Sequence, residues 1–115
     1  MVARAIRTAT AQISPPQFQH VFFTSSGSEG NDTNLRMVRR YWDILGYKER
    51  HTIISRHNAY HGSTMAGASL GGMSGMHAQG GLPIPNITHI EQPYWWQHGR
   101  PQGLTREAFG MQAAH

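Results

Sequence analysis

The stretch VFFTSSGSEGND, residues 21–32, joins an apolar run to a cluster of serines and glycines. Residues 20–24 are rich in β-branched and aromatic side chains, which is typical of a short buried strand. From Asn31 onward apolar residues recur at helical spacing, and Gly46 stands where a left-handed helix end is expected. The apolar stripe of this predicted helix consists of Leu35, Val38, Trp42 and Leu45. The stretch therefore predicts a strand, a tight turn and a helix.

The turn between this strand and this helix has the composition of an anion site. The first N–H groups of a helix have no partner inside it and carry the positive end of its dipole, so they attract phosphate. Gly27 allows close approach to the backbone, and Ser26 and Ser28 add hydroxyl groups. A plain serine cap followed by a glycine turn explains the same residues. From these residues alone both interpretations stay open.

Two common nucleotide motifs do not match this turn. A P-loop ends in Gly-Lys-Ser/Thr, and a dinucleotide turn has the spacing G-x-G-x-x-G. The segment GSEGND has neither pattern. What remains is a cup for a small phosphorylated cofactor in an α/β protein, where ligands bind outside the carboxyl ends of the strands.

Further elements follow along the chain. Residues 51–55 and 87–90 predict two short strands, and residues 63–72 predict a helix of small side chains between them. The helix that begins at Asn31 returns to the strand at 51–55 through a short loop. This arrangement predicts a right-handed βαβ unit and a mainly parallel sheet. Residues 104–108 indicate the start of a last helix.

The loop after the strand at 51–55 carries Tyr60 and His61. Because parallel strands end at one sheet edge, Tyr60 can stack on a planar ligand held at the glycine turn. Taken singly, Tyr60 also fits a half-buried loop tyrosine and His61 a structural histidine, and these alternatives stay open. His57 lies four residues before His61, but no glutamate stands between them and the segment is predicted as loop. We therefore expect no metal site.

The composition is that of one small folded domain without an internal repeat. Of the 115 residues 38% are hydrophobic and 14% are charged, which is unlike a disordered segment. The net charge is +4, but the arginines are scattered apart from three on the predicted helix, so we expect no nucleic-acid partner. The absence of cysteine leaves no disulfide and no thiolate metal site.

The two ends of the chain carry weaker signals. The N-terminal segment predicts a helix that faces a core with Val2, Ala5, Ile6, Ala9 and Ile13. No apolar stretch has the length of a signal peptide or a membrane span, so we expect a cytoplasmic protein with no membrane partner. Near the other end, the aromatic segment PYWW, residues 93–96, is expected to pack against a neighbouring segment.

Three blocks of the sequence together resemble the class III pyridoxal-phosphate aminotransferases, most closely the omega or polyamine:pyruvate branch. They are VFFTSSGSEGNDTNLRMVRRYW at 21–42, HTIISRHNAYHGSTMAGASLGGM at 51–73 and GLPIPNITHIEQPYWW at 81–96. The resemblance implies an α/β fold, with residues 1–115 forming part of the cofactor-binding large domain of a fold-type-I transferase. It implies pyridoxal 5'-phosphate as cofactor and amino transfer from a primary amine, such as a polyamine, to an α-keto acid such as pyruvate. It also implies a homodimer.

The resemblance assigns roles to residues of the turn and the loop. Ser26, Gly27 and Ser28 correspond to the residues that hold the cofactor phosphate. Tyr60 corresponds to the tyrosine that stacks on the pyridine ring, and His61 belongs to the same cofactor-binding loop. Gly30 departs from the usual alanine, which costs about 0.5–1 kcal/mol in helix stability and removes no phosphate contact.

Catalysis in the family needs two further residues. One is a lysine that forms a Schiff base with the cofactor, and the other is an aspartate that pairs with the pyridine nitrogen. Lys48 is the only lysine of this chain. It follows the predicted helix, about 20 Å from the phosphate residues at a rise of about 1.5 Å per residue, and so cannot take the lysine's role. We therefore expect an internal fragment with no catalytic residue, inactive alone.

Two other functions remain as alternatives. The chain could be a non-catalytic module that binds a phosphorylated ligand, such as pyridoxal phosphate, in the same cup. A basic nucleic-acid-binding domain ranks below it, because such a domain would bind with a steep dependence on salt.

Overall fold

Helix α2, Gly27–Ile44, is the longest element in the computed structural model, which describes Thr8, residues 12–18 and residues 20–114. Ser26 caps the helix with extended backbone, and its side chain accepts a hydrogen bond from the backbone N–H of Glu29. The helix ends at Ile44, Leu45 is its C-terminal cap residue, and Gly46 follows in the left-handed conformation with φ of 84°. The predicted helix and its glycine end are confirmed. It begins four residues before Asn31, because the serine cap outweighs the low helix propensity of Gly27 and Gly30.

A two-stranded parallel sheet forms the second layer. Strand β1, Ile53–Arg56, pairs with strand β2, Ile87–Ile90, in a register that sets Ile53 opposite Ile87 and Arg56 opposite Ile90. The predicted strand at 87–90 and the parallel arrangement are confirmed, and the predicted strand at 51–55 is displaced toward the C-terminus. Between the strands lie helix α3, Met65–Leu70, within the predicted helix at 63–72, and helix α4, Ser74–His77.

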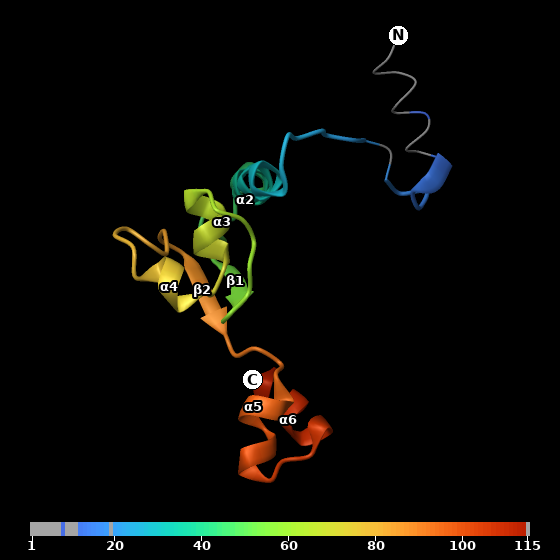
Figure 1. The fold of residues 1–115 in the computed structure, drawn as a ribbon. Coiled ribbons are helices and arrows are strands. Elements are labelled where there is room, and N and C mark those ends of the chain that lie inside the picture. The colour runs from blue at the N-terminus through green and yellow to red at the C-terminus, as the bar shows by residue number, and fades with distance from the viewer. Residues whose placement is uncertain (1–7, 9–11, 19, 115) are drawn as a thin grey trace.

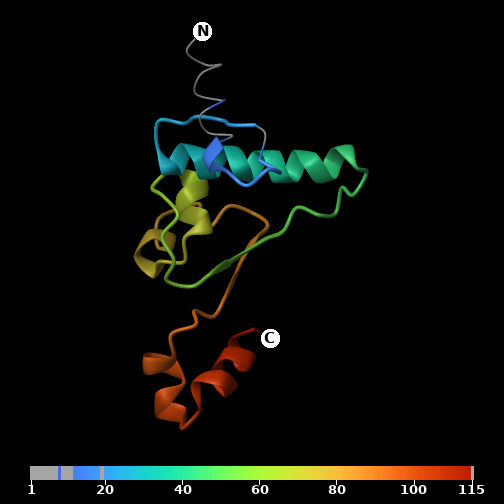
Figure 2. The ribbon, with the colours of Figure 1, turned by 90° about the vertical axis from the view of Figure 1, so that its right-hand side faces the viewer.

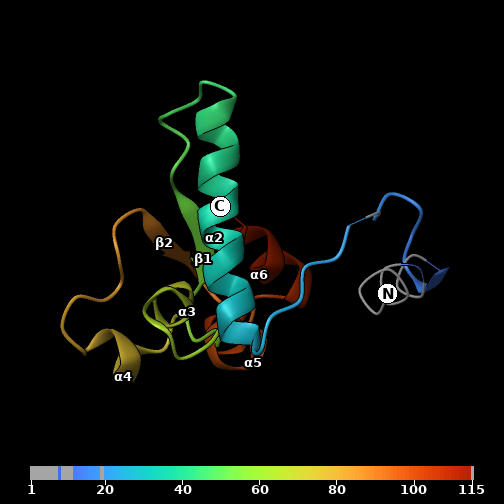
Figure 3. The ribbon, with the colours of Figure 1, turned by 90° about the horizontal axis from the view of Figure 1, so that it is seen from above.

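Helix α2, helix α3 and the sheet follow one another from top to bottom in Figure 1. Helix α2 lies across the top of α3, and the sheet lies beneath them (Figure 2). Seen from above, the start of α2 lies over the α3 segment, and the far end of α2 projects together with the loop that returns to β1 (Figure 3). The first turns of α2 are thereby brought against the segment that connects β1 to α3.

The predicted strand at 20–24 is wrong. These residues form no strand, and Phe22 and Phe23 are 71% and 64% exposed. A strand is stabilised by backbone hydrogen bonds to a neighbouring strand, and residues 20–24 have no such neighbour among the described residues. The βαβ unit predicted through α2 is therefore wrong as well. The crossover that the structure contains runs from β1 through α3 and α4 to β2.

The C-terminal segment packs separately, below the sheet (Figure 1). It contains helix α5, Trp95–His98, a 3₁₀ turn, Arg100–Gln102, and helix α6, Arg106–Ala113, around the buried ring of Phe109. The indole N–H of Trp95 donates to the carbonyl of Leu104 at 2.8 Å. Packing of the aromatic segment against a neighbour is therefore confirmed for Trp95, and α6 extends beyond the predicted 104–108.

Few side chains are deeply buried. Leu35, Ala68, Ile87 and Phe109 are the buried hydrophobic residues of the described part, and Ser69 is fully buried. The predicted N-terminal helix falls mostly on residues outside the described ones, and Ile13 is 86% exposed, contrary to its predicted place in a core. Among the described residues no helix combines the length and apolar character needed to cross a bilayer.

Candidate functional site

The start of α2 presents two backbone donors that have no partner among the described residues. The N–H of Glu29 donates to the Ser26 hydroxyl at 3.2 Å, and the N–H of Gly30 donates to the Ser26 carbonyl at 3.1 Å. The N–H groups of Gly27 and Ser28 make no hydrogen bond to any described residue. Together with the helix dipole they form a small positive surface.

The acidic residue of this turn does not compete for these donors. A carboxylate oxygen of Glu29 accepts a hydrogen bond from the backbone N–H of Ser25 at 2.9 Å. This bond satisfies a further donor just before the helix, in a variant of the reciprocal capping arrangement. The Glu29 side chain therefore supports the helix start and leaves the N–H groups of Gly27 and Ser28 open.

The second half of the site is the loop between β1 and α3. Asn58 takes a left-handed conformation with φ of 60°, its N–H donates to the Gly72 carbonyl at 2.8 Å, and the N–H of Gly72 donates to the Ala59 carbonyl at 2.9 Å. A Cβ at Gly72 would overlap the backbone of Arg56 and His57. The loop is thus held closely against the end of α3 before it reaches Tyr60.

Three hydrogen bonds join this loop to one face of α2. The N–H of Ser63 donates to the Ser28 hydroxyl at 3.2 Å, and the side-chain amide of Asn31 donates to the His61 carbonyl at 2.8 Å. The Thr64 hydroxyl donates to the Asp32 carboxylate at 2.6 Å. The helical residues of these bonds are i, i+3 and i+4, which share one helix face.

Gly62 is required for this close approach. Its φ of 124° is rarely adopted by other residues, and a Cβ at this position would lie 2.5 Å from the Ser28 hydroxyl oxygen. Backbone of the loop therefore touches the side chain of the first helical turn directly.

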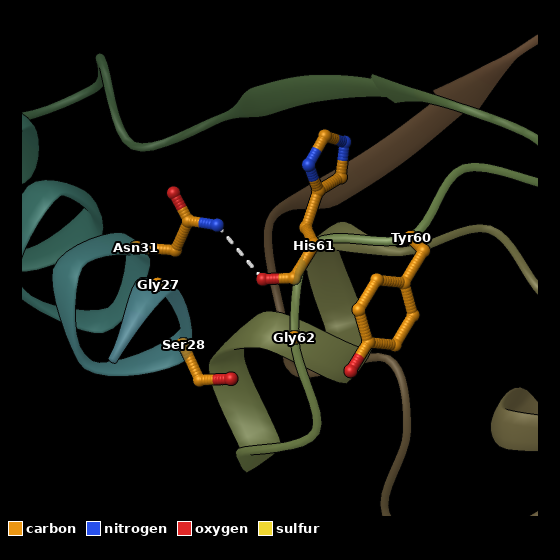
Figure 4. Close-up of a pocket in the computed structure, with 6 residues that line it drawn as sticks. All are labelled: Gly27, Ser28, Asn31, Tyr60, His61 and Gly62. Carbon is orange, nitrogen blue, oxygen red and sulfur yellow. Dashed lines mark hydrogen bonds between the residues drawn. The ribbon is translucent and has the colours of Figure 1, made fainter. Parts of the chain in front are cut away.

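A cavity of about 350 Å³ opens where the helix start and the loop meet. This volume is within the range of small-molecule sites. Figure 4 shows the residues that line it, which are Gly27, Ser28, Asn31, Tyr60, His61 and Gly62. No acidic residue is among them. The Tyr60 side chain is 64% exposed at the rim of the cavity, so a face of its ring is available to a ligand.

Four of the five predicted site residues come together here, namely Gly27, Ser28, Tyr60 and His61. Ser26 does not line the cavity, and its hydroxyl is engaged in capping the helix. His61 contributes its backbone carbonyl, while its imidazole points away from the Ser28 hydroxyl (Figure 4).

Sequence reasoning missed Asn31 and Gly62 as residues of the cavity wall. A signal was present for Asn31, which lies one helical turn after Ser28 and so shares its face.

Two other predicted features have clear positions. Lys48 lies in a turn after α2, about 27 Å along the helix from its start if the 18 residues rise about 1.5 Å each. The ring of His57 faces His89, with 5.6 Å between ring centroids, so it has a packing partner. Within the described ranges, no group of three or more His, Cys, Asp or Glu residues could hold a metal ion.

Comparisons with known proteins identify the family to which this arrangement belongs. The model of the family "Aminotransferase class-III" matches residues 2–109. A putrescine–pyruvate aminotransferase of Pseudomonas aeruginosa is 53% identical over 106 residues, which cover 92% of this chain and 23% of that protein. Gamma aminobutyrate transaminase 2 of Solanum lycopersicum is 44% identical over 95 residues, which cover 83% of this chain and 20% of that protein.

Solved structures agree with this result. The crystal structure of an omega-transferase from Vibrio fluvialis JS17 superposes with a TM-score of 0.88 at 34% identity and covers 97% of this chain and 26% of that one. A PMP-bound aminotransferase from Vibrio fluvialis superposes with a TM-score of 0.84 at 35% identity, over 96% of this chain and 24% of that one. The predicted fold class, part of a fold-type-I α/β transferase, is confirmed. The chain belongs to the class III aminotransferase family.

Proposed function

We propose that this chain forms the phosphate-binding and ring-stacking part of the cofactor site in a pyridoxal-phosphate-dependent aminotransferase. Class III aminotransferases depend on this cofactor. One observation carries the proposal: two backbone N–H groups that have no partner in the described part of the chain belong to residues lining the same cavity as an exposed tyrosine ring. An anionic group and a flat aromatic ring are the two ends of pyridoxal phosphate.

The phosphate binds at the start of α2. The N–H groups of Gly27 and Ser28 donate to phosphate oxygens, and the helix dipole favours the negative charge. The Ser28 hydroxyl accepts from the N–H of Ser63, so its own proton remains for a phosphate oxygen. The absence of an acidic residue in the cavity wall supports this assignment, because a carboxylate there would repel the ligand.

The pyridine ring lies against Tyr60. Offset stacking of two aromatic rings is worth about 0.5–1.5 kcal/mol beyond the area that it buries. The exposed ring of Tyr60 has no aromatic partner among the described residues, so its face is free for this contact.

When bound, pyridoxal phosphate supplies an electron sink for the carbon that exchanges its amino group. The residues of this chain bind and orient the cofactor. The cavity wall contains no lysine, and Lys48 lies at the opposite end of α2. We therefore assign proton transfer to residues of the protein outside this stretch, and we propose that the chain by itself does not catalyse transamination.

The relatives support a proposal for the substrates. A protein named putrescine–pyruvate aminotransferase shares 53% of the aligned residues, which supports a primary amine as donor and an α-keto acid such as pyruvate as acceptor. We also propose that the complete protein is a homodimer, as the resemblance implies. The chain spans 23% of that relative.

The experiment compares two serine substitutions in the intact protein that contains this chain. Ser28→Asp places a negative charge beside the phosphate, and Ser74→Asp makes the same change at the exposed first residue of α4, outside the cavity. We expect Ser28→Asp to lose most cofactor retention and putrescine-dependent amino transfer to pyruvate, and Ser74→Asp to keep both. Equal cofactor occupancy in the unsubstituted protein and in both variants would overturn the assignment of the phosphate site. Cofactor binding without any amino transfer would favour the non-catalytic binding module.

A further inference from the structure

We infer that Asn31 is a positioning residue that fixes the orientation of the Tyr60 ring through the backbone of the loop, an inference that rests on the proposed function. The side-chain amide of Asn31 donates to the carbonyl of His61 at 2.8 Å. That carbonyl belongs to the residue directly after Tyr60. In Figure 4 the Asn31 side chain points at this carbonyl, between the helix start and the loop.

The need for such a bond follows from Gly62. Glycine restricts backbone rotation less than any other residue, so the peptide group between His61 and Gly62 is the easiest place for the loop to turn. The bond from Asn31 holds the carbonyl on one side of this glycine. Rotation of the carbonyl would carry the neighbouring Tyr60 with it. The Asn31 amide therefore restrains the ring by fixing the backbone to which the ring is attached.

The other two bonds between α2 and the loop serve the fold on the far side of Gly62. The Thr64 hydroxyl donates to Asp32 and also accepts from the N–H of Gly67, at 3.1 Å, as the cap of α3. Its loss would therefore disturb the start of a helix. The side chain of Asn31 has no other hydrogen bond to a described residue, and it is the one that reaches the residue next to Tyr60. Substitution of Asn31 therefore tests the orientation of the ring without removing the cap of α3.

The test is a double-mutant cycle between Asn31→Leu and Tyr60→Ala in the intact protein, with pyridoxal phosphate as the probe. Asn34→Leu is the matched control, because Asn34 lies on the same helix, is exposed and makes no side-chain hydrogen bond to a described residue. Each variant is measured for the cofactor dissociation constant and for the visible circular dichroism of the bound cofactor. The latter reports how the chromophore is held in its chiral surroundings.

With Tyr60 present, we expect Asn31→Leu to weaken cofactor binding about 3- to 10-fold, as loss of one hydrogen bond does, and to change the dichroism. In the Tyr60→Ala background the same substitution has no further effect, because the ring that it positions is absent. Asn34→Leu changes neither quantity. Asn31→Gln, which retains an amide donor, recovers part of the dichroism. If Asn31→Leu does not fold, Asn31→Ala replaces it in the same cycle.

Equal effects of the Asn31 substitution with and without Tyr60 would overturn the positioning role while leaving the proposed function intact. An effect of Asn34→Leu as large as that of Asn31→Leu would also overturn it. Absence of cofactor binding by the unsubstituted protein would overturn the inference and the proposed function together.

Discussion

The two halves of α2 are held by different forces. The first half is polar and is joined to the loop by the hydrogen bonds of Ser28, Asn31 and Asp32. The second half carries exposed apolar side chains, among them Tyr41 at 55% and Ile44 at 70% exposure. Geometry at the first half therefore depends on single atoms and their directions. In the second half Arg39 donates to the carbonyls of His51 and Pro85, and we expect the exposed apolar side chains there to tolerate change. Substitutions in the intact protein test this difference between the two halves.

Among substitutions at the contact between α2 and the loop, the largest effect is expected for Gly62→Ala. The new Cβ would lie 2.5 Å from the Ser28 hydroxyl oxygen at a φ of 124°, so the loop must leave the helix start or adopt strained backbone at a cost of about 1–3 kcal/mol. We expect a lower free energy of unfolding, measured by urea denaturation, and loss of cofactor. Gly75→Ala is the control, since nothing lies within 4 Å of its Cβ position. A mutant of Gly62 as stable as that control would contradict the described contact.

The next effect concerns the bond between Thr64 and Asp32. Thr64→Val keeps the shape of the side chain but removes both the donor to Asp32 and the acceptor that caps α3. Loss of a cap costs about 0.5–2 kcal/mol, and an unpaired carboxylate adds to this. Thr64→Ser retains the hydroxyl and should restore most of the loss. Thermal unfolding compares the two variants, and an equal decrease in both would contradict the role assigned to the Thr64 hydroxyl.

Tyr60 should give a smaller effect on stability and a specific one on the cofactor. Tyr60→Ala removes the stacking surface and should weaken cofactor binding by at least about 0.5–1.5 kcal/mol and lower activity, because the contact area is lost together with the stacking. Tyr60→Phe should be mild, because stacking needs the ring. Cofactor titration followed by absorbance distinguishes the two. Similar defects in both variants would show that the hydroxyl group matters more than the ring.

The smallest effect is expected at the other end of the helix. Ile44→Ala removes a side chain that is 70% exposed, so the free energy of unfolding should change by no more than about 0.5 kcal/mol. Leu35→Ala, at a residue that is 6% exposed on the same helix, should cost about 2–5 kcal/mol and serves as the positive control. A loss at Ile44 comparable to that at Leu35 would remove the contrast between the two halves.

Local signals were enough to predict part of this molecule. The cap at Ser26, the left-handed Gly46 and the apolar run at 87–90 each act within a few residues, so the sequence indicates them directly. The strand predicted at 20–24 failed because a strand also requires a neighbour, and no local pattern reports whether one is present.

The residues of the site also divide into those that local signals predict and those that depend on distant neighbours. Gly27 and Ser28 were predicted from the turn itself, and Tyr60 from its place after a strand. The bonds of Ser28, Asn31 and Asp32 join residues that are 35, 30 and 32 positions apart in the chain. Their partners depend on how α2 lies against the loop, which only the folded arrangement specifies.

The two open donors at the start of α2 belong to the main chain. Their presence therefore depends little on which amino acids occupy these positions. Every amino acid except proline supplies the same N–H group, so substitution of a side chain by any other leaves these donors in place. Proline is well tolerated as the first residue of a helix, which is the place of Gly27. A proline there would leave the helix intact and remove one donor. These N–H groups therefore persist through almost any substitution at positions 27 and 28, whereas Gly62 of the same wall has no room for a side chain.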